Sequence, residues 1–415
     1  MSSNAPCNSR PFSWLVKSCI PTAHNHRQPT APHSSSAAPL RRQTSISSLP
    51  DDLLLECLSR VAQCSISSLP LVCRRWSDLL DSPAFHSLRR RRNLLRLNLF
   101  AISISDHSLF AASLCLGFES AWRISSVLAD DVFNRGPPFI SLFSHSRSVV
   151  IGRRIYVIGR TAMIRCDAWT ATVVLLPGPV ASRKKFAAAV VAGKIYVAGG
   201  SGRTAVVEEY DPDAESWRAV STASRRRYGC VGAAVDGVFY VIGGLKIGSS
   251  GNEGVSRAAG PDAALVYAGS MDLYDVAAGQ WLKSRTVPVG GCVVAACAEG
   301  GFVYILSSHA VELSFWEFNG ALKSSGFAEW RRLKSPPVQV RLDSAVRFSC
   351  VGAGGRVVLV QVTGRTQDMA RRSGRGERVF RGGTMMVYDC AAGEWSRGAD
   401  LPEFIGSAAC VTVEC

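Results

Sequence analysis

Short hydrophobic runs, rich in β-branched and aromatic residues, dominate the chain from about residue 94 onward. The pattern is clearest between Phe186 and Trp217, where a small turn joins two apolar runs and Gly199-Gly200 follows them. A third run ends at Tyr210, and Trp217 closes the segment. Runs of this length, bounded by glycines and turn residues, predict β-strands.

Parts of this segment recur along the chain at a fixed internal spacing. In three places a tryptophan follows a tyrosine after seven residues: Tyr210 and Trp217, Tyr274 and Trp281, Tyr388 and Trp395. Weaker copies, which lack the di-glycine, occupy 149–169 and 302–330. Recurrence every ~40–60 residues is typical of a radial or stacked repeat fold.

Only the segment 46–92 has a helical pattern. Ser48 and Pro50 precede Asp51-Asp52, which predicts a helix start because the two acids lie at the positive end of the helix dipole. Leu54, Leu58 and Val61 follow at intervals of four and three residues and therefore share one face. A second helix and a short third helix are predicted before the arginines at 89–92. Three short helices bury a very small core, so we expect the module to gain stability from a partner.

The helical segment resembles an F-box. The resemblance rests on LPDDLLLECL at 49–58, VCRRW at 72–76 and SPAF at 82–85, which occur in the expected order and at the expected separations. One departure is the segment 62–68 between the helices, which no proline begins. The resemblance implies a helical surface that binds a Skp-type adaptor within an SCF-type cullin–RING ubiquitin ligase. Carried over by position, the adaptor-binding candidates, which would face the adaptor or form the core of the module, are Leu49, Pro50, Leu54, Leu58, Val72 and Trp76.

The repeats resemble kelch repeats, each of which is one four-stranded blade of a β-propeller. The resemblance therefore implies a small all-α F-box module followed by an all-β kelch propeller. Five copies follow residue 145, while a strand at 407–413 lacks three partners and 94–124 supplies three strands without a first. Pairing these segments closes the ring as a sixth blade and removes its free edges. We therefore expect six blades, with five or seven as alternatives.

The expected domains are a tail at 1–45, an F-box at 46–92 and a propeller at 94–415. The tail is rich in Ser and Pro and has no acidic residue, so we expect it to be disordered. Two insertions in the propeller, 246–269 and 363–381, have the composition of long loops. No apolar run is long enough to span a bilayer. We expect a location in the cytoplasm or nucleus; an organelle transit peptide at the N-terminus is the alternative.

The formal net charge is +15, and much of it is clustered. No recognisable nucleic-acid-binding module accompanies the clusters, so we expect neither nucleic acid nor membrane as a partner. Several clusters precede first strands of blades, and equivalent positions in a ring converge at one end. We hypothesise that they bind an acidic or phosphorylated target segment; the alternative is that they are solvated or pair with local acids. The substrate-binding candidates are Arg183, Lys184, Lys185, Arg225, Arg226, Arg227 and Arg347.

Kelch propellers also include copper radical oxidases, which need His and Tyr ligands around a central metal. His107, His145 and His309 fall in different repeats without a shared pattern, and no hydrolase, phosphate-binding or zinc-protease motif occurs. We expect no catalytic residue, metal or cofactor. An F-box followed by kelch repeats resembles a plant family and implies a non-catalytic substrate receptor for ubiquitination. The alternatives are a kelch scaffold without a ligase role and a propeller oxidase.

Overall fold

The computed structural model describes residues 46–104, 109–117, 121–127, 139–246, 267–288, 290–309, 312–320, 330–338, 346–363, 383–402, 405 and 408–414. The predicted tail and nearly all of both predicted insertions lie outside these residues. The chain divides into two units, 1–49 and 50–415. In the first, the described part is a 3-10 turn, η1 (Ile46–Ser48), and Leu49. No helix in the described ranges is long and apolar enough to cross a membrane.

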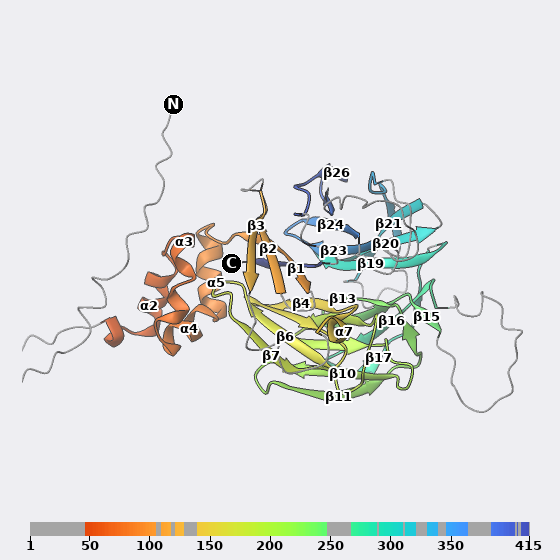
Figure 1. Ribbon diagram of the computed structural model, residues 1–415, viewed down its shortest axis with the longest axis horizontal. Coiled ribbons are helices and arrows are strands. Elements are labelled where there is room, and N and C mark those ends of the chain that lie inside the picture. Colours follow the sequence, from red (N-terminus) through yellow and green to blue (C-terminus); the bar gives the residue numbers. More distant parts are fainter. Residues whose placement is uncertain are drawn as a thin grey trace, which may run out of the picture. The chain divides into compact units, whose positions relative to one another are not determined.

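The second unit begins with four α-helices and one 3-10 turn (Figure 1). Asp51 and Asp52 occupy the first turn of the first helix, and the Ser82 hydroxyl caps the last by accepting a hydrogen bond from the Phe85 N–H. The elements are α2 (Asp51–Leu58), α3 (Gln63–Ile66), η2 (Leu69–Leu71), α4 (Arg74–Leu80) and α5 (Pro83–Arg91). Their small core consists of Leu54, Leu58, Ile66, Leu80 and Phe85.

Arg89 on α5 is fully buried and braces the helical module from inside. Its guanidinium donates to the backbone carbonyls of Ser59, Val61 and Leu94 and to the Gln63 side chain. Hydrogen bonds of this kind offset much of the hydration that a buried charge loses. Arg89 therefore joins the end of α2, the start of α3 and the exit from α5.

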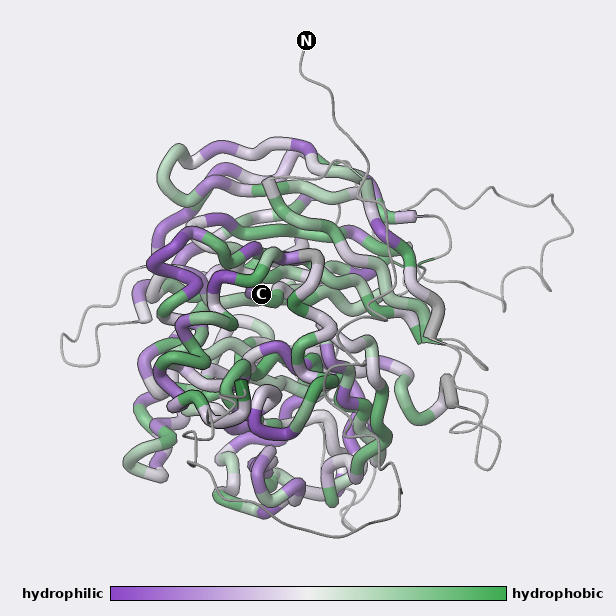
Figure 2. The backbone as a smooth tube through the Cα atoms, turned by 90° about the vertical axis from the view of Figure 1, so that its left-hand side faces the viewer, coloured by the Kyte–Doolittle hydropathy of each residue, from purple (hydrophilic) through white to green (hydrophobic). Residues whose placement is uncertain are grey.

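The remainder of the second unit forms six antiparallel blades, each with a path of four strands. Figure 2 shows hydrophobic segments recurring along these strands. Blade 1 is β4 (Arg147–Ile151), β5 (Arg154–Ile158), β6 (Ala162–Asp167) and β7 (Val173–Pro177). Blade 2 is β8 (Ala187–Val191), β9 (Lys194–Ala198), β10 (Val206–Asp211) and β11 (Ser216–Thr222). Blade 3 is β13 (Val231–Val235), β14 (Val238–Ile242), β16 (Ser270–Asp275) and β17 (Gln280–Trp281), with β18 (Arg285–Thr286) also paired to β16.

Blades 4 and 5 repeat the same order. Blade 4 is β19 (Cys292–Glu299), β20 (Phe302–His309), β21 (Glu312–Asn319) and β22 (Trp330–Leu333). Blade 5 is β23 (Val346–Gly352), β24 (Arg356–Thr363), β25 (Thr384–Asp389) and β26 (Glu394–Arg397). A separate two-stranded ribbon pairs β12 (Arg227–Tyr228) with β15 (Leu245–Lys246). The short helix α7 (Phe139–Phe143) precedes blade 1.

The sixth blade closes the ring from both ends of the chain, as the sequence predicts. Its order is β27 (Ala409–Glu414), β1 (Leu97–Ile104), β2 (Leu109–Cys115) and β3 (Arg123–Val127). Going round the ring, each first strand contacts the next: β4, β8, β13, β19, β23, β27 and again β4. Neighbouring first strands run in parallel, because Cys410 near the start of β27 meets Ser349 while Thr412 near its end meets Gly352.

The repeated tyrosines and tryptophans join strands within a blade and also join blades. Tyr210 pairs with Trp217 across β10 and β11, with ring centroids 5.2 Å apart, and the pairs at 274/281 and 388/395 have the same register. Each indole also donates to a backbone carbonyl of the preceding blade or of the link that follows it; Trp217 donates to Pro177. The other donors are Trp281 to Thr222, Trp330 to Thr286, Trp395 to Lys334 and Trp122 to Ala399.

The blades give the ring two different ends. At the end where the first strands begin, which we call the loop end, the second strand of each blade passes to the third. The segments 247–266 and 364–382 both depart from this end, after Lys246 and Thr363. At the opposite end, which we call the turn end, tight turns join the first and second strands, as at Gly152-Arg153.

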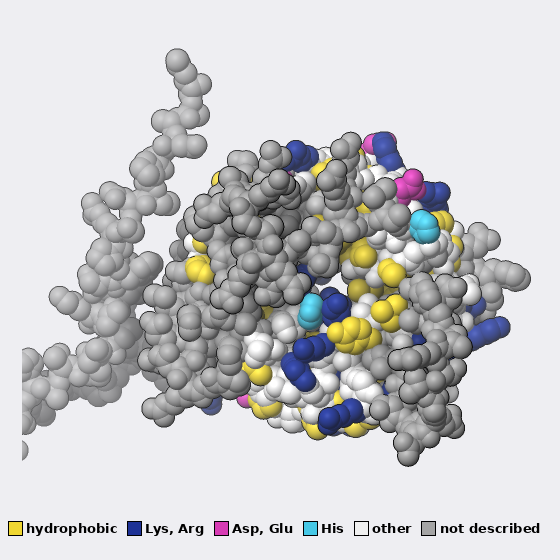
Figure 3. Space-filling model, turned by 45° about the vertical axis from the view of Figure 1, so that its right-hand side comes forward, with side chains coloured by type: hydrophobic (Ala, Val, Ile, Leu, Met, Phe, Trp, Pro, Cys, Tyr) yellow, Lys and Arg dark blue, Asp and Glu magenta, His cyan; other side chains and the backbone are white. Residues whose placement is uncertain are grey.

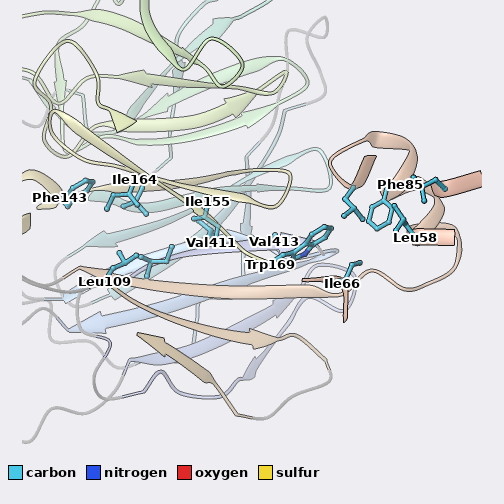
Figure 4. Packing of buried hydrophobic residues seen from close by; sticks show 14 residues of the cluster. Leu58, Ile66, Phe85, Leu109, Phe143, Ile155, Ile164, Trp169, Val411 and Val413 are labelled. Atoms are coloured by element: carbon cyan, nitrogen blue, oxygen red, sulfur yellow. The ribbon is translucent and has the colours of Figure 1, made fainter. Parts of the chain in front are cut away.

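The helical module packs against the turn end. Arg153 is buried and contacts Asp167 of its own blade at 2.8 Å, Asp81 at 3.3 Å and the Ser77 hydroxyl at 3.2 Å. The Arg153 guanidinium also lies 4.9 Å from the Trp169 ring, which meets the Phe85 ring edge-on. Figure 4 shows the cluster running from Leu58 and Phe85 through Trp169 to Val413 and Ile155. We call this contact the seam.

Candidate functional site

The six adaptor-binding candidates do not share one surface. Leu54 and Leu58 are almost completely buried and form the core of the helical module, because α2 turns this face toward α4 and α5. Trp76 is half-buried and packs against the same core, while Pro50 and Val72 are exposed. Leu49, in the first unit, is half-buried. We therefore correct the prediction for Leu54 and Leu58, whose role is to hold the helices together.

A different set of apolar side chains is exposed on the module. Leu53 is 50%, Leu71 70% and Val72 59% exposed, although large aliphatic side chains usually avoid water in a folded domain. Asp51 forms an ion pair with Arg75 at 2.6 Å, which brings the start of α2 beside the start of α4, just after Val72. We call Leu53, Leu71 and Val72 the apolar ridge. Leu53 had a sequence signal: three consecutive leucines on one helix cannot all face inward.

Two of the basic candidates lie inside their blades. Arg183 and Arg227 are 1% exposed. Arg183 pairs with the buried Glu208 at 2.6 Å and donates to the Gly199 carbonyl; Arg227 pairs with the buried Asp272 at 2.8 Å and donates to the Gly243 carbonyl. This repeated arrangement uses the donors of both side chains within the blade. We therefore correct the prediction that Arg183 and Arg227 bind a target.

The sequence contains a signal for these internal pairs. Glu208 and Asp272 both stand two residues before the blade tyrosine, on the third strand. In blade 5 the same position holds Met386, which offers no charge. Arg347 differs in position, because it lies on β23 itself; it is exposed and forms no ion pair with the residues described. The buried pairs of blades 2 and 3 therefore join a basic residue that precedes the first strand to an acid on the third strand of the same blade.

The remaining basic candidates have varied surroundings. Arg225 is half-buried and pairs with Asp272 at 3.1 Å. Arg226 is half-buried and has no ion-pair partner among the described residues. Lys184 and Lys185 are half-buried, and the Lys185 ammonium lies 5.7 Å from the centre of the Tyr228 ring. Lys184, Lys185, Arg226 and Arg347 therefore remain candidates for binding an anionic group.

The structure adds Arg147 and His145, which sequence reasoning did not select, to these basic residues. Arg147 begins β4, yet its side chain donates to the Phe186 carbonyl of the next blade at 2.7 Å and to the Cys230 carbonyl before blade 3 at 3.0 Å. A side chain that reaches the second blade along must lie near the axis of the ring. We call His145, Arg147, Lys184, Lys185 and Arg347 the mouth cluster.

The charges of the mouth cluster act on one another. Burial, together with the positive charges of Arg347, Lys185, Arg147 and Lys184, lowers the pKa of His145 from 6.5 to about 4. Burial and the charge of Arg347 also lower the pKa of Arg147. Arg147 and Arg347 lie at the starts of the first strands of blades 1 and 5, His145 and the two lysines just precede those of blades 1 and 2, and all five therefore lie at the loop end. Figure 3 shows basic side chains and a histidine gathered beside a hollow on one face.

The propeller histidines were the candidate metal ligands in the sequence. Within the described ranges, no group of three or more His, Cys, Asp and Glu side chains is placed to hold a metal ion. His309 contacts the Gly290 carbonyl at 2.6 Å, His145 belongs to the mouth cluster, and His107 lies outside the described residues. His145 and His309 therefore belong to no such group in the described ranges.

A helical module with an exposed apolar ridge, joined to a six-bladed ring with the kelch pattern, defines an F-box/kelch protein. The F-box domain family matches residues 46–88, and the Kelch motif family matches 182–224. The chain is 55% identical to F-box/kelch-repeat protein At5g26960 of Arabidopsis thaliana over 98% of its own length and 99% of the relative. It is 26% identical to F-box/kelch-repeat protein At1g67480 of the same plant, over 58% of this chain and 61% of that one. The chain belongs to the F-box/kelch-repeat family.

Proposed function

We propose that this protein is a substrate receptor of an SCF-type ubiquitin ligase. The helical module would bind a Skp-type adaptor, and the propeller would hold the target protein while other subunits transfer ubiquitin. The protein itself would be a non-catalytic adaptor. The mechanism is proximity, because tethering raises the effective concentration of target lysines near the conjugating enzyme.

The observation that carries the proposal is the apolar ridge of a family-typical F-box. Leu53, Leu71 and Val72 lie near the starts of α2 and α4, whereas the seam uses Ser77 and Asp81 at the end of α4 and Phe85 on α5. The residues of the apolar ridge therefore take no part in the seam and stay exposed. An exposed apolar set of this kind supports burial against a protein partner.

Capture of a Skp-type adaptor by the purified full-length chain tests the proposal. Leu53→Asp combined with Val72→Asp should weaken capture by at least about tenfold, because each change puts a charge into the expected interface. Both residues are exposed, so the fold should be preserved, which circular dichroism checks. A buried leucine such as Leu54 is unsuitable for this test, because its replacement would unfold the module.

Val180→Asp is the matched control. Val180 is an 80% exposed aliphatic residue in the link between blades 1 and 2, so the substitution has the same chemistry outside the ridge. It should leave capture unchanged. If the wild-type chain captures no adaptor, or if the double variant captures it as well as the wild type, the receptor proposal fails and a kelch scaffold without a ligase role takes its place.

A further inference from the structure

We infer that the mouth cluster is a binding site for a phosphate-class dianion, formed by Arg147, Arg347, Lys184 and Lys185 around His145. This inference deepens the proposed function and rests on it, because it assigns the binding of the target protein to the loop end of the propeller. The fold places these side chains at the same end of the ring. Arg147 and Arg347 lie on the first strands of blades 1 and 5, and the two lysines immediately precede the first strand of blade 2.

Hydrogen bonds fix the side chain of Arg147 but leave one of its nitrogens able to donate to a ligand. Its Nε and Nη2 donate to the carbonyls of Phe186 and Cys230, which holds the guanidinium across the ring. Nη1 has no hydrogen-bond partner among the residues that the structure describes. A braced guanidinium with a free donor is pre-organised for a planar or tetrahedral oxyanion.

Charge balance distinguishes this site from many of the basic residues on the blades. Arg153, Arg154, Arg165, Arg183, Arg225, Arg227 and Arg331 each pair with a carboxylate. In the described ranges, none of Arg147, Lys184, Lys185 and Arg347 has such a partner. Among the residues that the structure describes, these four cations at the loop end therefore have no carboxylate that neutralises them.

The number of positive charges in the mouth cluster indicates which class of anion the site would bind. A phosphate monoester carries close to two negative charges at pH 7 and has three strong acceptor oxygens, so it meets several cations at once better than a single carboxylate does. The low pKa of His145 agrees with an unneutralised site, because each neighbouring cation opposes its protonation. A phosphorylated target segment and a free phosphate compound share this chemistry.

The first experiment follows His145 in the full-length protein by NMR of 13C-labelled histidine, with its signal assigned by its loss in His145→Asn. Inorganic phosphate, added at constant ionic strength, should raise the pKa of His145 by at least about one unit because the bound dianion offsets the cations. Arg347→Ala should weaken phosphate binding by at least about tenfold, the effect of losing one charged hydrogen-bond donor. Arg347 is exposed, so this variant should fold.

Arg397→Ala is the control on the same blade. Arg397 is exposed on β26 and already pairs with Asp400, so its loss should not change phosphate binding. The inference is overturned if sodium chloride of equal ionic strength moves the pKa of His145 as far as phosphate does. It is equally overturned if Arg397→Ala and Arg347→Ala weaken binding to the same extent.

A second measurement distinguishes the two sources of phosphate. The probes are inorganic phosphate, a five-residue peptide with phosphoserine between alanines, and the same peptide without phosphate. Binding of the phosphopeptide at least about tenfold more tightly than inorganic phosphate assigns the site to a phosphorylated target segment; equal binding assigns it to a free phosphate compound. Equal binding of the unphosphorylated peptide contradicts the inference.

Adaptor capture keeps this inference separate from the proposed function. Arg347→Ala leaves the apolar ridge intact, so it should capture the Skp-type adaptor as the wild type does. If no adaptor is captured but phosphate binds and depends on Arg347, the receptor function fails while the anion site stands. If capture is normal and phosphate does not bind, only the anion site fails.

Discussion

Arg183 lies inside blade 2 because Glu208 offers a buried carboxylate at the matching place on the third strand. Arg226, only one residue away from Arg227, has no such partner in the described part of the chain and stays half-buried. Neighbouring arginines in one cluster therefore have unrelated roles, and the deciding residue is remote in the sequence. A count of basic residues predicts the charge of a region but not which guanidinium a target meets.

The pair of Arg183 and Glu208 gives a stability prediction at this scale. Arg183→Ala should lower the free energy of unfolding by about 3–5 kcal/mol, because it leaves the buried Glu208 without its counter-charge. Arg226→Ala, the matched control, should change it by less than about 0.5 kcal/mol. Denaturant unfolding of the two variants measures the difference. Equal stability of the variants would contradict the internal role of Arg183.

At the scale of elements, blade 1 departs from the other five in a way that explains the seam. Elsewhere a tryptophan donates to the preceding blade, but in blade 1 the tryptophan, Trp169, lies in the shortened turn between β6 and β7. There it is nearly buried between the Arg153 guanidinium and the Phe85 ring. The residue that joins blades elsewhere therefore joins the propeller to the helical module here.

Trp169→Ala should uncouple the helical module from the propeller. Removing a buried indole costs about 3–5 kcal/mol, so hydrogen exchange of the amides in α4 and α5 should become faster. Trp217→Ala is the control, because it weakens blade 2 and should leave exchange in α4 and α5 as in the wild type. Unchanged exchange in the Trp169 variant would show that the seam contributes nothing to the helices.

The elements themselves were largely predictable. The strands of the well-formed repeats, the three tyrosine–tryptophan pairs and the F-box helices all occur where periodicity placed them. Local patterns suffice here because each pairing is with the next strand along the chain. The outward face of α2 was not predictable in this way, since which leucine is exposed depends on where α4 and α5 pack.

At the scale of the whole molecule, the last strand closes the ring. β27 pairs with β1 and supplies the buried residues Val411 and Val413. A chain ending at Ser407 should lose its cooperative thermal transition, because blade 6 then exposes a strand edge and an apolar face. A chain ending at Glu414 is the control and should unfold as the full chain does. A retained transition in the shorter chain would contradict closure by β27.

The sequence by itself determined the class of the protein, because an F-box and kelch repeats are written in short local patterns and in a regular spacing. It also favoured six blades over five or seven, since pairing an unpaired strand at one end with three at the other removes free edges. Only the tertiary structure decided which charges are available. Arg183 and Arg227 are buried because strands that lie apart in the sequence pack together in the ring. The same packing brings Arg147, Arg347 and two lysines to one mouth.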